Sequence, residues 1–296
     1  MTGPHPPSYA VRSAVERALI EDLEPLGDLT SAVLPEGARG RAELVARGEG
    51  VVAGCMCVGE SFAQIDPDVR VTWRLDDGNE VAPGDVLGSV EGPMDSILSG
   101  ERTALNFLCH LSGIATLTRR YVRATHGRVR ILDTRKTTPG LRALERAAVR
   151  AGGGVNHRGS LSGGILIKDN HLAVMTVEDA VRRSRMRWPG RLVEVECDSL
   201  EQVRDAVEAG AEMVLLDNMS PAMVRTCVEE IAGAALVEVS GGISLANIGD
   251  YADAGADLVS VGALTHSAPI LDIGLDTKPM RLKAPSPPTD PDAAGN

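Results

Sequence analysis

Aromatic residues are scarce in this chain of 296 residues, because Phe, Tyr and Trp together make up only 2%. A buried core must therefore be aliphatic, since hydrophobic residues still amount to 43% of the chain. That fraction, with 24% charged residues, is typical of a folded protein and argues against extended disorder. No run of about 18 apolar residues occurs, and the N-terminal end has no short apolar stretch, so we expect neither a transmembrane helix nor a secretory signal.

Cysteine is rare too. An odd number and the lack of paired Cys-x-x-Cys motifs argue against a disulfide framework and against a zinc site. Cys55 and Cys57 have no second pair or histidine nearby, so we expect no metal there. Reduced thiols of this kind predict a cytoplasmic protein. The five residues are Cys55, Cys57, Cys109, Cys197 and Cys227.

Lysine is almost absent from the middle of the chain. Only four of the 30 basic residues are Lys, and Lys278 and Lys283 lie near the polar C-terminal end. The other two are Lys136 and Lys168. A compact ammonium can make point-charge contact with an anion where a planar guanidinium does not fit. Both are therefore candidate anion-binding residues, with chance survival of two lysines as the alternative.

The net charge of −11 hides one basic segment. Residues 101–171 contain 13 Lys and Arg against 4 Asp and Glu, a net charge of +9, and also four of the six histidines. An acidic protein is a poor ligand for nucleic acid, so we expect no such partner. The basic segment favours a pocket for a small, highly charged anion. A solvent-facing helix is the alternative, and it accounts for Arg119, Arg120 and Arg123.

The N-terminal part of the chain mixes helix and strand patterns. In chain order we expect a helix over 9–23, strands at 41–53 and 69–75, a small β-meander over 76–94, and a helix over 99–125. Ser99 is a candidate N-cap of that last helix, and a break is expected near Ser112–Gly113.

The rest of the chain repeats a short β-branched run followed by a helical pattern. Two units resemble each other directly, DAVEAGAEMVLLD at 205–217 and DYADAGADLVSVG at 250–262. This cadence predicts an α/β fold with parallel strands, as a complete or partial (α/β) barrel. A doubly wound open sheet competes, but its GxGxxG turn is absent. The runs lie at 129–134, 164–169, 192–197, 213–218, 236–242 and 258–263.

Charged residues or glycines end each run, where a barrel has its active site. Glu196 and Asp217 would end neighbouring strands, and two carboxylates there suit sugar hydroxyls or Mg²⁺. Salt bridges to Arg135 or Lys168 are the alternative for either carboxylate. Glu194 shares a strand face with Glu196 and could be a second member of the site.

Two later strand ends carry glycines and are candidates for a phosphate site. Open backbone N–H groups, with an expected helix start at Ile243–Ser244, would cradle the anion. A tight turn is the alternative for the first group taken alone, but barrels often use two neighbouring late strands in this way. The two groups are Ser240, Gly241 and Gly242, and then Gly262 and Ala263.

A run of glycines at 152–154 precedes His157 and Arg158. Arg158, together with Arg135, offers forked donors for carboxylates. His157 can act as a charged or a neutral donor near pH 7. A His-Arg pair in a loop is usually a surface feature, but its place among the other cations makes it a candidate binding pair.

Several longer stretches resemble the quinolinate phosphoribosyltransferase family, also called nicotinate-nucleotide pyrophosphorylase (carboxylating), in the same order over nearly the whole chain. They are ERTALNFLCHLSGIAT (101–116), DTRKTTPGLRALERAAVRAGGGVNHR (133–158), LIKDNH (166–171), EVECDSLEQ (194–202), LLDN (215–218), SGGIS (240–244) and VGALTHS (261–267). The resemblance implies that quinolinate and phosphoribosyl pyrophosphate (PRPP), with Mg²⁺, give nicotinate mononucleotide, pyrophosphate and CO₂ on the route to NAD.

The resemblance also implies an architecture, a homodimer with an incomplete α/β barrel after an N-terminal α/β sandwich domain. The sandwich would span 1–112, with 268–283 packing back on it, and the barrel would span 113–267. The Pro- and Asp-rich residues 284–296 predict a disordered tail.

Site roles follow from the resemblance, position by position. Arg135, His157, Arg158 and Arg102 from the partner subunit would hold the acceptor's carboxylates. Lys168 would lie near the pyridine and the transferring centre, and Lys136 would meet the pyrophosphate. Glu196 and Asp217 would hold ribose hydroxyls and Mg²⁺. Residues 240–242, with Gly262 and Ala263, would hold the 5′-phosphate.

Two loop positions depart from the family's usual pattern. Ser160 stands where the family usually has Gly, and Gly163 where it usually has Asp. Because both adjoin the loop that carries His157 and Arg158, a related pyridine carboxylate is an alternative acceptor. A catalytically silent phosphate-binding sensor is a further alternative, against which the intact set of cations and carboxylates argues.

Overall fold

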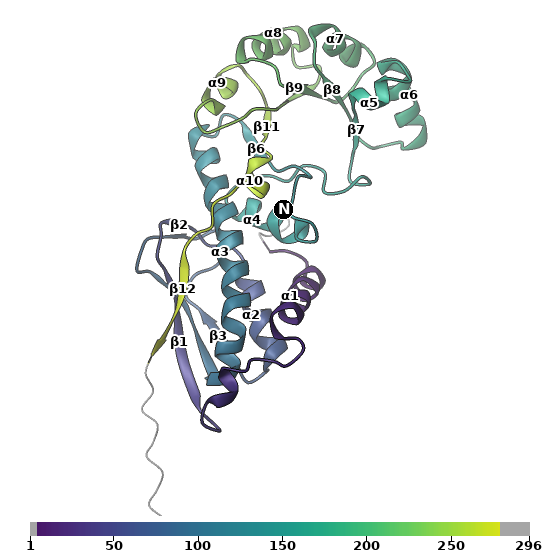
Figure 1. Cartoon of the computed structure of the whole chain (residues 1–296). Helices are drawn as coiled ribbons and strands as arrows, with labels where there is room; N and C mark the ends of the chain where they lie inside the picture. Colours follow the sequence, from purple (N-terminus) through teal and green to yellow (C-terminus); the bar gives the residue numbers. More distant parts are fainter. Residues whose placement is uncertain (1–4, 279–296) are drawn as a thin grey trace, which may run out of the picture.

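The computed structural model describes residues 5–278, and it places a small antiparallel sheet below a larger parallel one (Figure 1). The small sheet has the strand order β12-β1-β5-β3, and a separate pair joins β2 to β4. α2 and α3 pack on the small sheet around an aliphatic cluster that includes Leu44, Val90 and Ile97. The elements are α1 (Ser8–Leu23), the 3₁₀ turn η1 (Ser31–Val33), β1 (Arg39–Ala46), β2 (Gly50–Val51), α2 (Cys55–Ile65), β3 (Arg70–Trp73), β4 (Glu80–Val81), β5 (Val86–Pro93), α3 (Met94–Ala124) and β12 (Ile273–Lys278).

The first helix and the N-terminal strands are confirmed, but the expected β-meander over 76–94 is wrong. β4 pairs with β2, whereas β5 lies between β1 and β3. Glycine- and aspartate-rich turns signal that the chain reverses, but they do not specify which strand it then meets. The pairing is decided instead by which apolar faces α2 and α3 cover.

α3 is one continuous helix of 31 residues, so the expected break near Ser112–Gly113 is wrong. The Ser112 hydroxyl hydrogen-bonds to the backbone N–H and C=O of Ala53, at 3.0 and 3.1 Å. A Cβ at position 113 would lie 2.2 Å from the carbonyl oxygen of Pro269. The small residues therefore make room for two crossing segments. Ser99 is not an N-cap either, because the helix begins at Met94 and the Ser99 hydroxyl donates to Asp28 instead.

The larger sheet has six parallel strands in the order β6-β11-β10-β9-β8-β7. Strands β7 to β11 follow one another in chain order, and β6 joins the far end beside β11, so the sheet curls into a barrel open between β6 and β7. One bridge from Leu132 to Val155 places residues 155–157 along the open edge of β6. The predicted incomplete barrel is confirmed, and the doubly wound alternative is excluded. The strands are β6 (Arg130–Leu132), β7 (Ile165–Ile167), β8 (Val193–Cys197), β9 (Met213–Asp217), β10 (Leu236–Ser240) and β11 (Leu258–Ser260).

Alternation along each strand separates the barrel's wall from its lumen. Val193, Val195 and Cys197 are fully buried among the aliphatic residues of the surrounding helices. Glu194 and Glu196 consequently face the lumen. This core runs on without interruption into α1 and the middle of α3, so the barrel and the lower layer share one apolar interior. The helices are α4 (Arg142–Ala151), α5 (Asp169–Leu172), α6 (Val177–Arg187), α7 (Leu200–Glu208), α8 (Pro221–Ile231), α9 (Ile248–Asp253) and α10 (Ala263–His266).

The C-terminal part of the described chain returns to the lower layer, and the expected domain boundary lies within a helix. After α10 the chain returns to the small sheet, where β12 pairs antiparallel with β1. Residues 112 and 113, where the sequence suggests a division, lie inside α3. The expectations for 279–283 and for a disordered tail at 284–296 lie outside the described residues. Among the described helices, none is long and apolar enough to cross a membrane.

Candidate active site

A histidine held by two carboxylates lies in the barrel lumen. His157 follows the Leu132–Val155 bridge, and its Nε2 lies 3.0 Å from Glu194 Oε2 on β8 and 3.4 Å from Glu238 Oε2 on β10. Burial alone would lower the pKa of His157, but the interactions with both glutamates outweigh it and raise the pKa from 6.5 to about 10. The ring is therefore an imidazolium at neutral pH. Among the described residues, Glu194 Oε1 is buried without a hydrogen-bond partner, and Glu238 Oε2 has the ion pair with His157 but no hydrogen bond.

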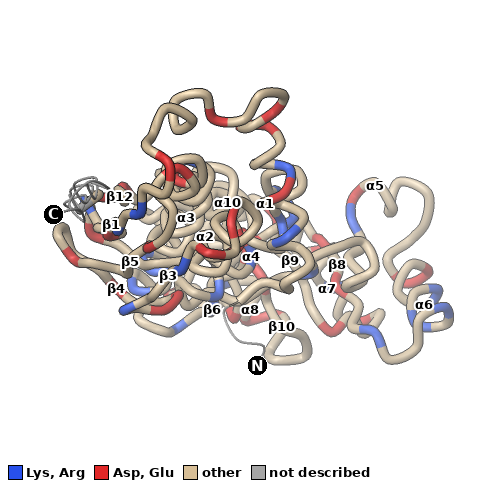
Figure 2. Tube along the Cα trace, turned by 90° about the horizontal axis from the view of Figure 1, so that it is seen from below, with Lys and Arg blue, Asp and Glu red and all other residues tan. Residues whose placement is uncertain are grey.

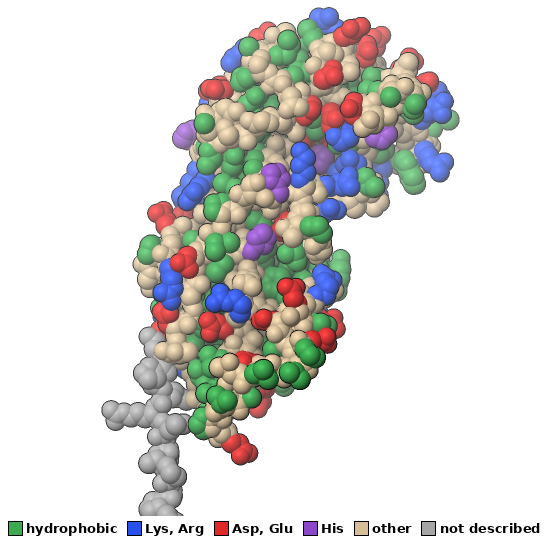
Figure 3. Space-filling model, viewed as in Figure 1, with side chains coloured by type: hydrophobic (Ala, Val, Ile, Leu, Met, Phe, Trp, Pro, Cys, Tyr) green, Lys and Arg blue, Asp and Glu red, His purple; other side chains and the backbone are tan. Residues whose placement is uncertain are grey.

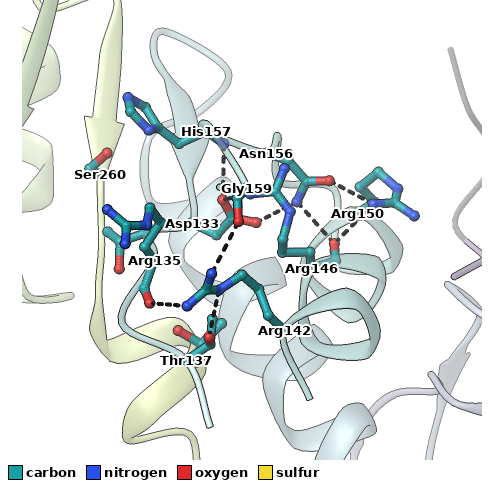
Figure 4. A network of polar contacts seen from close by, with 12 residues as sticks. Asp133, Arg135, Thr137, Arg142, Arg146, Arg150, Asn156, His157, Gly159 and Ser260 are labelled. Atoms are coloured by element: carbon teal, nitrogen blue, oxygen red, sulfur yellow. Dashed lines mark hydrogen bonds and ion pairs between the residues drawn. The ribbon is translucent and has the colours of Figure 1, made fainter. Parts of the chain in front are cut away.

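Asp133 anchors the loop that carries this histidine. Its fully buried carboxylate accepts hydrogen bonds from the backbone N–H of His157 at 2.9 Å and from the side chain of Asn156, and it pairs with Arg146 of α4 at 3.3 Å (Figure 4). Burial raises the pKa of Asp133, and the charge of Arg146 opposes that shift. Asp133 thus follows a strand end, as the sequence suggests, but it fastens the wall rather than facing the mouth.

Lys168 and Glu196 form an ion pair at the ends of β7 and β8. This is the salt bridge that the sequence offers as an alternative to ligand binding. The register of the sheet pairs Glu196 with Leu215 and Asp217 with Ser240, so Asp217 faces the same side two residues further toward the mouth. The Asp217 carboxylate accepts a hydrogen bond from the side chain of Asn218 at 2.7 Å. Neither carboxylate is enclosed, and the pair could accept hydroxyls or share a cation.

The glycine-containing strand ends lie beside this pair. Gly241 has φ +94°, and a Cβ there would lie 2.1 Å from the Asn218 side chain, so only glycine fits the turn. The helix start expected at Ile243–Ser244 is wrong, because α9 begins at Ile248 after a turn. Open backbone groups at 240–242, rather than a helix end, are therefore what this strand offers an anion. A Cβ at Gly262 would lie 3.3 Å from Lys136 Cδ, so the Lys136 stem passes this second strand end.

Two arginines lie close together at the barrel mouth, near Glu194 and Glu196. Arg158 donates to the Gly164 carbonyl at 3.4 Å, and burial together with the charge of Arg135 lowers its pKa. Arg135 Nε is buried and has no hydrogen-bond partner within the described chain. Figure 3 shows Lys and Arg side chains gathered around a histidine on the concave side of the molecule, below the barrel. An unpaired buried donor among clustered cations is the arrangement that an anionic ligand would complete.

Arg102 is the one candidate that lies apart from the mouth. It is exposed in the N-terminal half of α3, and no hydrogen bond or ion pair of its side chain occurs within residues 5–278. The solvent-facing alternative holds for Arg120 and Arg123, which are exposed, but not for Arg119, which is half-buried and donates to backbone carbonyls. Arg119 and Arg123 pair with Glu80 of β4 at 2.8 and 2.7 Å, and Figure 2 shows that both acidic and basic residues lie around the strands of the lower sheet.

The sequence motifs indicate neither Glu238 nor Arg142 as residues of the mouth. Glu238 lies in the middle of the apolar run LVEVS, just as the candidate Glu194 lies in LVEVEC, so the repeated Val-Glu-Val pattern could have indicated it. Arg142 reads as an ordinary helix residue, yet its guanidinium contacts two loops of the mouth (Figure 4). Its signal would have been its position just after the loop that carries Arg135 and Lys136.

The fold and the mouth together define a partial (α/β)-barrel protein whose strand ends present cations, two carboxylates and a glycine turn to anionic ligands. Family models agree with this class and make it specific. The model of the C-terminal domain of quinolinate phosphoribosyl transferase matches residues 114–276, and that of its N-terminal domain matches residues 28–112. The chain belongs to the quinolinate phosphoribosyl transferase family.

Individual relatives cover nearly the whole chain. A nicotinate-nucleotide pyrophosphorylase (carboxylating) from Mycobacterium leprae (strain TN) is 45% identical over 276 residues, which is 90% of this chain and 97% of the relative. A probable enzyme of the same name from Bacillus subtilis (strain 168) is 41% identical over 270 residues, covering 90% of this chain and 93% of that protein. The structure of the nicotinate-nucleotide pyrophosphorylase from Francisella tularensis superposes with a TM-score of 0.88 at 34% identity, over 92% of this chain and 97% of that one.

Proposed function

We propose that the protein joins quinolinate to the phosphoribosyl group of PRPP and releases pyrophosphate and CO₂, so that nicotinate mononucleotide is formed for NAD biosynthesis. The names of its relatives support this activity. The observation that carries it in this chain is the meeting of Arg135, His157, Arg158 and Lys168 at one barrel mouth. Quinolinate is a dianion and PRPP carries several negative charges, so bringing them together requires a strongly cationic pocket.

The acceptor side of the proposed site is the imidazolium with its arginines. Arg135, Arg158 and His157 would hold the two carboxylates of quinolinate, joined by Arg102 from a second copy of the chain. The unpartnered Arg135 Nε supports this assignment, because a buried donor needs an acceptor. Lys168, tied to Glu196, would lie near the pyridine and the transferring centre.

The donor side is the glycine turn with its neighbours. The 5′-phosphate would bind to the backbone at Ser240, Gly241 and Gly242 and at Gly262 and Ala263, and Lys136 would meet the pyrophosphate. Glu196 and Asp217 would hold the ribose hydroxyls and a Mg²⁺ ion that arrives with PRPP. Two hard oxygen donors on neighbouring strands fit this metal, which usually takes one or two carboxylates together with substrate phosphates. When bound, Mg²⁺ would neutralise charge on the departing pyrophosphate.

The chemistry requires positioning and charge rather than a protein base. The bond from C1′ to pyrophosphate breaks, positive charge develops at C1′, and the nearby Glu196 and Asp217 stabilise it. The pyridine nitrogen then bonds to C1′ and becomes cationic. The carboxylate next to that nitrogen leaves as CO₂, its electron pair stays on the ring carbon beside the cationic nitrogen, and a proton from solvent completes the ring.

We also propose that the protein works as a homodimer in a reducing, cytoplasmic environment. Exposed apolar side chains at Tyr9, Leu26, Leu29 and Val33 support a covered surface on the N-terminal segment. Arg102 has no ion pair within the described residues, which supports a role outside its own chain. The five cysteines are free, and four of them are buried, which suits a reducing compartment.

Product analysis tests the proposal directly. Incubating the protein with PRPP, Mg²⁺ and quinolinate should give nicotinate mononucleotide by mass spectrometry. Arg135→Ala and Lys168→Ala should each lower kcat/KM by about a hundredfold or more. Arg204→Ala, which breaks only an exposed pair with Glu230 on α7 and α8, is the matched control and should retain activity.

Other outcomes of the same assay would redirect the assignment. If quinolinate is inert and another pyridine carboxylate in a panel reacts, the acceptor differs, and the loop around Ser160 and Gly163 is then the place to look. PRPP binding by calorimetry without turnover on any acid would make the protein a sensor. Undiminished activity in both alanine variants would contradict the assigned roles.

A further inference from the structure

A single guanidinium joins the two loops that carry the acceptor-side cations. Arg142, at the start of α4, donates from Nη2 to the Arg135 carbonyl at 3.2 Å and from Nη1 to the Gly159 carbonyl at 3.2 Å. Its Nε also donates to Thr137 Oγ1 at 3.0 Å (Figure 4). Residues 135–137 follow β6, and Gly159 follows Arg158 in the neighbouring loop, which the Leu132–Val155 bridge brings alongside β6. Arg142 therefore fixes the separation between Arg135 and the His157–Arg158 pair.

The next carbonyl along the same loop is held by a residue of a different helix. Thr265, buried in α10, donates its hydroxyl to the Lys136 carbonyl at 2.7 Å. The Lys136 stem lies against Gly262, at the end of β11. Two consecutive carbonyls are thus tied to different elements, Arg135 to α4 and Lys136 to α10. Arg135 is on the proposed acceptor side, and Lys136 is on the proposed donor side.

We propose that Arg142 and Thr265 are positioning residues that hold residues 135–137 from two different helices, Arg142 setting the acceptor half of the mouth and Thr265 the donor half. This inference rests on the proposed function for which half takes which substrate. The clamp needs the fork of a guanidinium, because three acceptors on two loops lie around one planar group. A lysine keeps the charge but reaches one acceptor well, so Arg142→Lys separates geometry from charge.

The two variants should each raise the KM for a different substrate. Arg142→Lys should raise the KM for quinolinate by roughly tenfold and leave the KM for PRPP within about twofold, since loss of one or two hydrogen bonds corresponds to that factor. Thr265→Val, which keeps the shape and removes the hydroxyl, should raise the KM for PRPP by roughly three- to tenfold and spare quinolinate. A merely structural role would lower the amount of folded enzyme without changing the KM for one substrate more than the KM for the other.

Matched controls exist elsewhere in the chain. Arg119 also ties backbone carbonyls, those of Gly152, Gly78 and Ala151, but none of these carbonyls belongs to the two loops that Arg142 joins. Thr125 is fully buried, and its hydroxyl donates to the Val122 carbonyl three residues back, as Thr265 also does toward Gly262. Arg119→Lys and Thr125→Val should therefore leave both KM values within about twofold.

Hydrogen exchange of the substrate-free protein makes the test independent of activity. Arg142→Lys should speed amide exchange at both 134–138 and 157–160, whereas Arg119→Lys should not. The clamp is supported if amide exchange is faster in both loops and the KM for quinolinate rises while the KM for PRPP does not. Unchanged exchange, or KM values that move together, overturns it. If wild-type protein is inert toward quinolinate, the proposed function fails, but exchange in the two loops still decides whether Arg142 clamps them.

Discussion

Neighbouring side chains govern how charge is distributed at the barrel mouth. His157 is an imidazolium because two glutamates face it, and Lys168 is balanced by Glu196. Arg135 Nε is buried and donates no hydrogen bond to any residue of 5–278. The mouth is therefore cationic where an acceptor would enter and close to neutral where a ribose would lie. This distribution suits two anionic substrates that must meet at a carbon where positive charge develops.

The carboxylates around His157 lead to a prediction about pH and stability. Its folded pKa of about 10 lies above the ordinary 6.5, so its stabilising contribution is fully present below about pH 6.5 and is lost as pH rises toward 10. Glu238→Gln should lower the pKa of His157 and reduce the free energy of unfolding at pH 7 by about 1–3 kcal/mol. Urea unfolding between pH 6 and 10 measures both effects.

The same variant has a kinetic consequence and a natural control. With the pKa of His157 lowered, the KM for quinolinate should rise between pH 7 and 9, where the wild-type value stays flat. Glu230→Gln removes an exposed carboxylate paired with Arg204 and should change neither profile. A flat KM in the Glu238 variant would mean that the acceptor does not depend on the histidine's charge.

The sequence identified the residues of the mouth by their rarity and their place at strand ends. Lys136 and Lys168 stood out because lysine is scarce, and Glu196 and Asp217 because they close apolar runs. Arg142 could not be found in this way, because an arginine in a helix has many ordinary uses. Its role depends on Gly159, 17 residues away, and only the folded loops bring that carbonyl within reach.

At the scale of elements, periodicity predicted the barrel well and the lower sheet poorly. Strands β7 to β11 each pair with the strand of the next repeat along the chain, so the local repeat predicts most of the barrel's topology, and only the pairing of β6 with β11 is long-range. β1, by contrast, pairs with β12 from the other end of the chain, for which no local pattern exists. The expected break in α3 failed for a related reason. Gly113 is small because Pro269 crosses there, not because the helix ends.

Gly113→Ala tests whether that close crossing determines the residue. Alanine favours a helix by about 1 kcal/mol over glycine, but a Cβ 2.2 Å from the backbone of Pro269 cannot be accommodated without moving the return to β12. We expect a net loss of about 1–3 kcal/mol in the free energy of unfolding. Gly59 of α2 has nothing within 4 Å of its Cβ position, so Gly59→Ala should instead stabilise by about 0.5–1 kcal/mol. Denaturant midpoints that move in the same direction would refute the crossing argument.

At the scale of the whole molecule, one chain brings together most of the proposed site but leaves Arg102 outside it. α3 carries this residue on the lower layer, and residues 5–278 give it neither an ion pair nor a hydrogen bond. The exposed apolar side chains of the N-terminal segment lie on that lower layer as well. A symmetric pair, in which each lower layer covers the other copy's barrel mouth, would complete two sites at once.

Complementation between two inactive variants tests whether the site is shared. In a heterodimer of Arg102→Ala and Lys168→Ala chains, one mouth combines an intact Lys168 with the intact Arg102 of the other chain, and the second mouth lacks both. Two different tags and tandem purification isolate this heterodimer, which should have roughly half of the wild-type activity because one of its two sites is whole. Each homodimer alone should be nearly inactive. If Arg102 acted within its own chain, both mouths of the heterodimer would be defective, and activity would stay at the level of the homodimers.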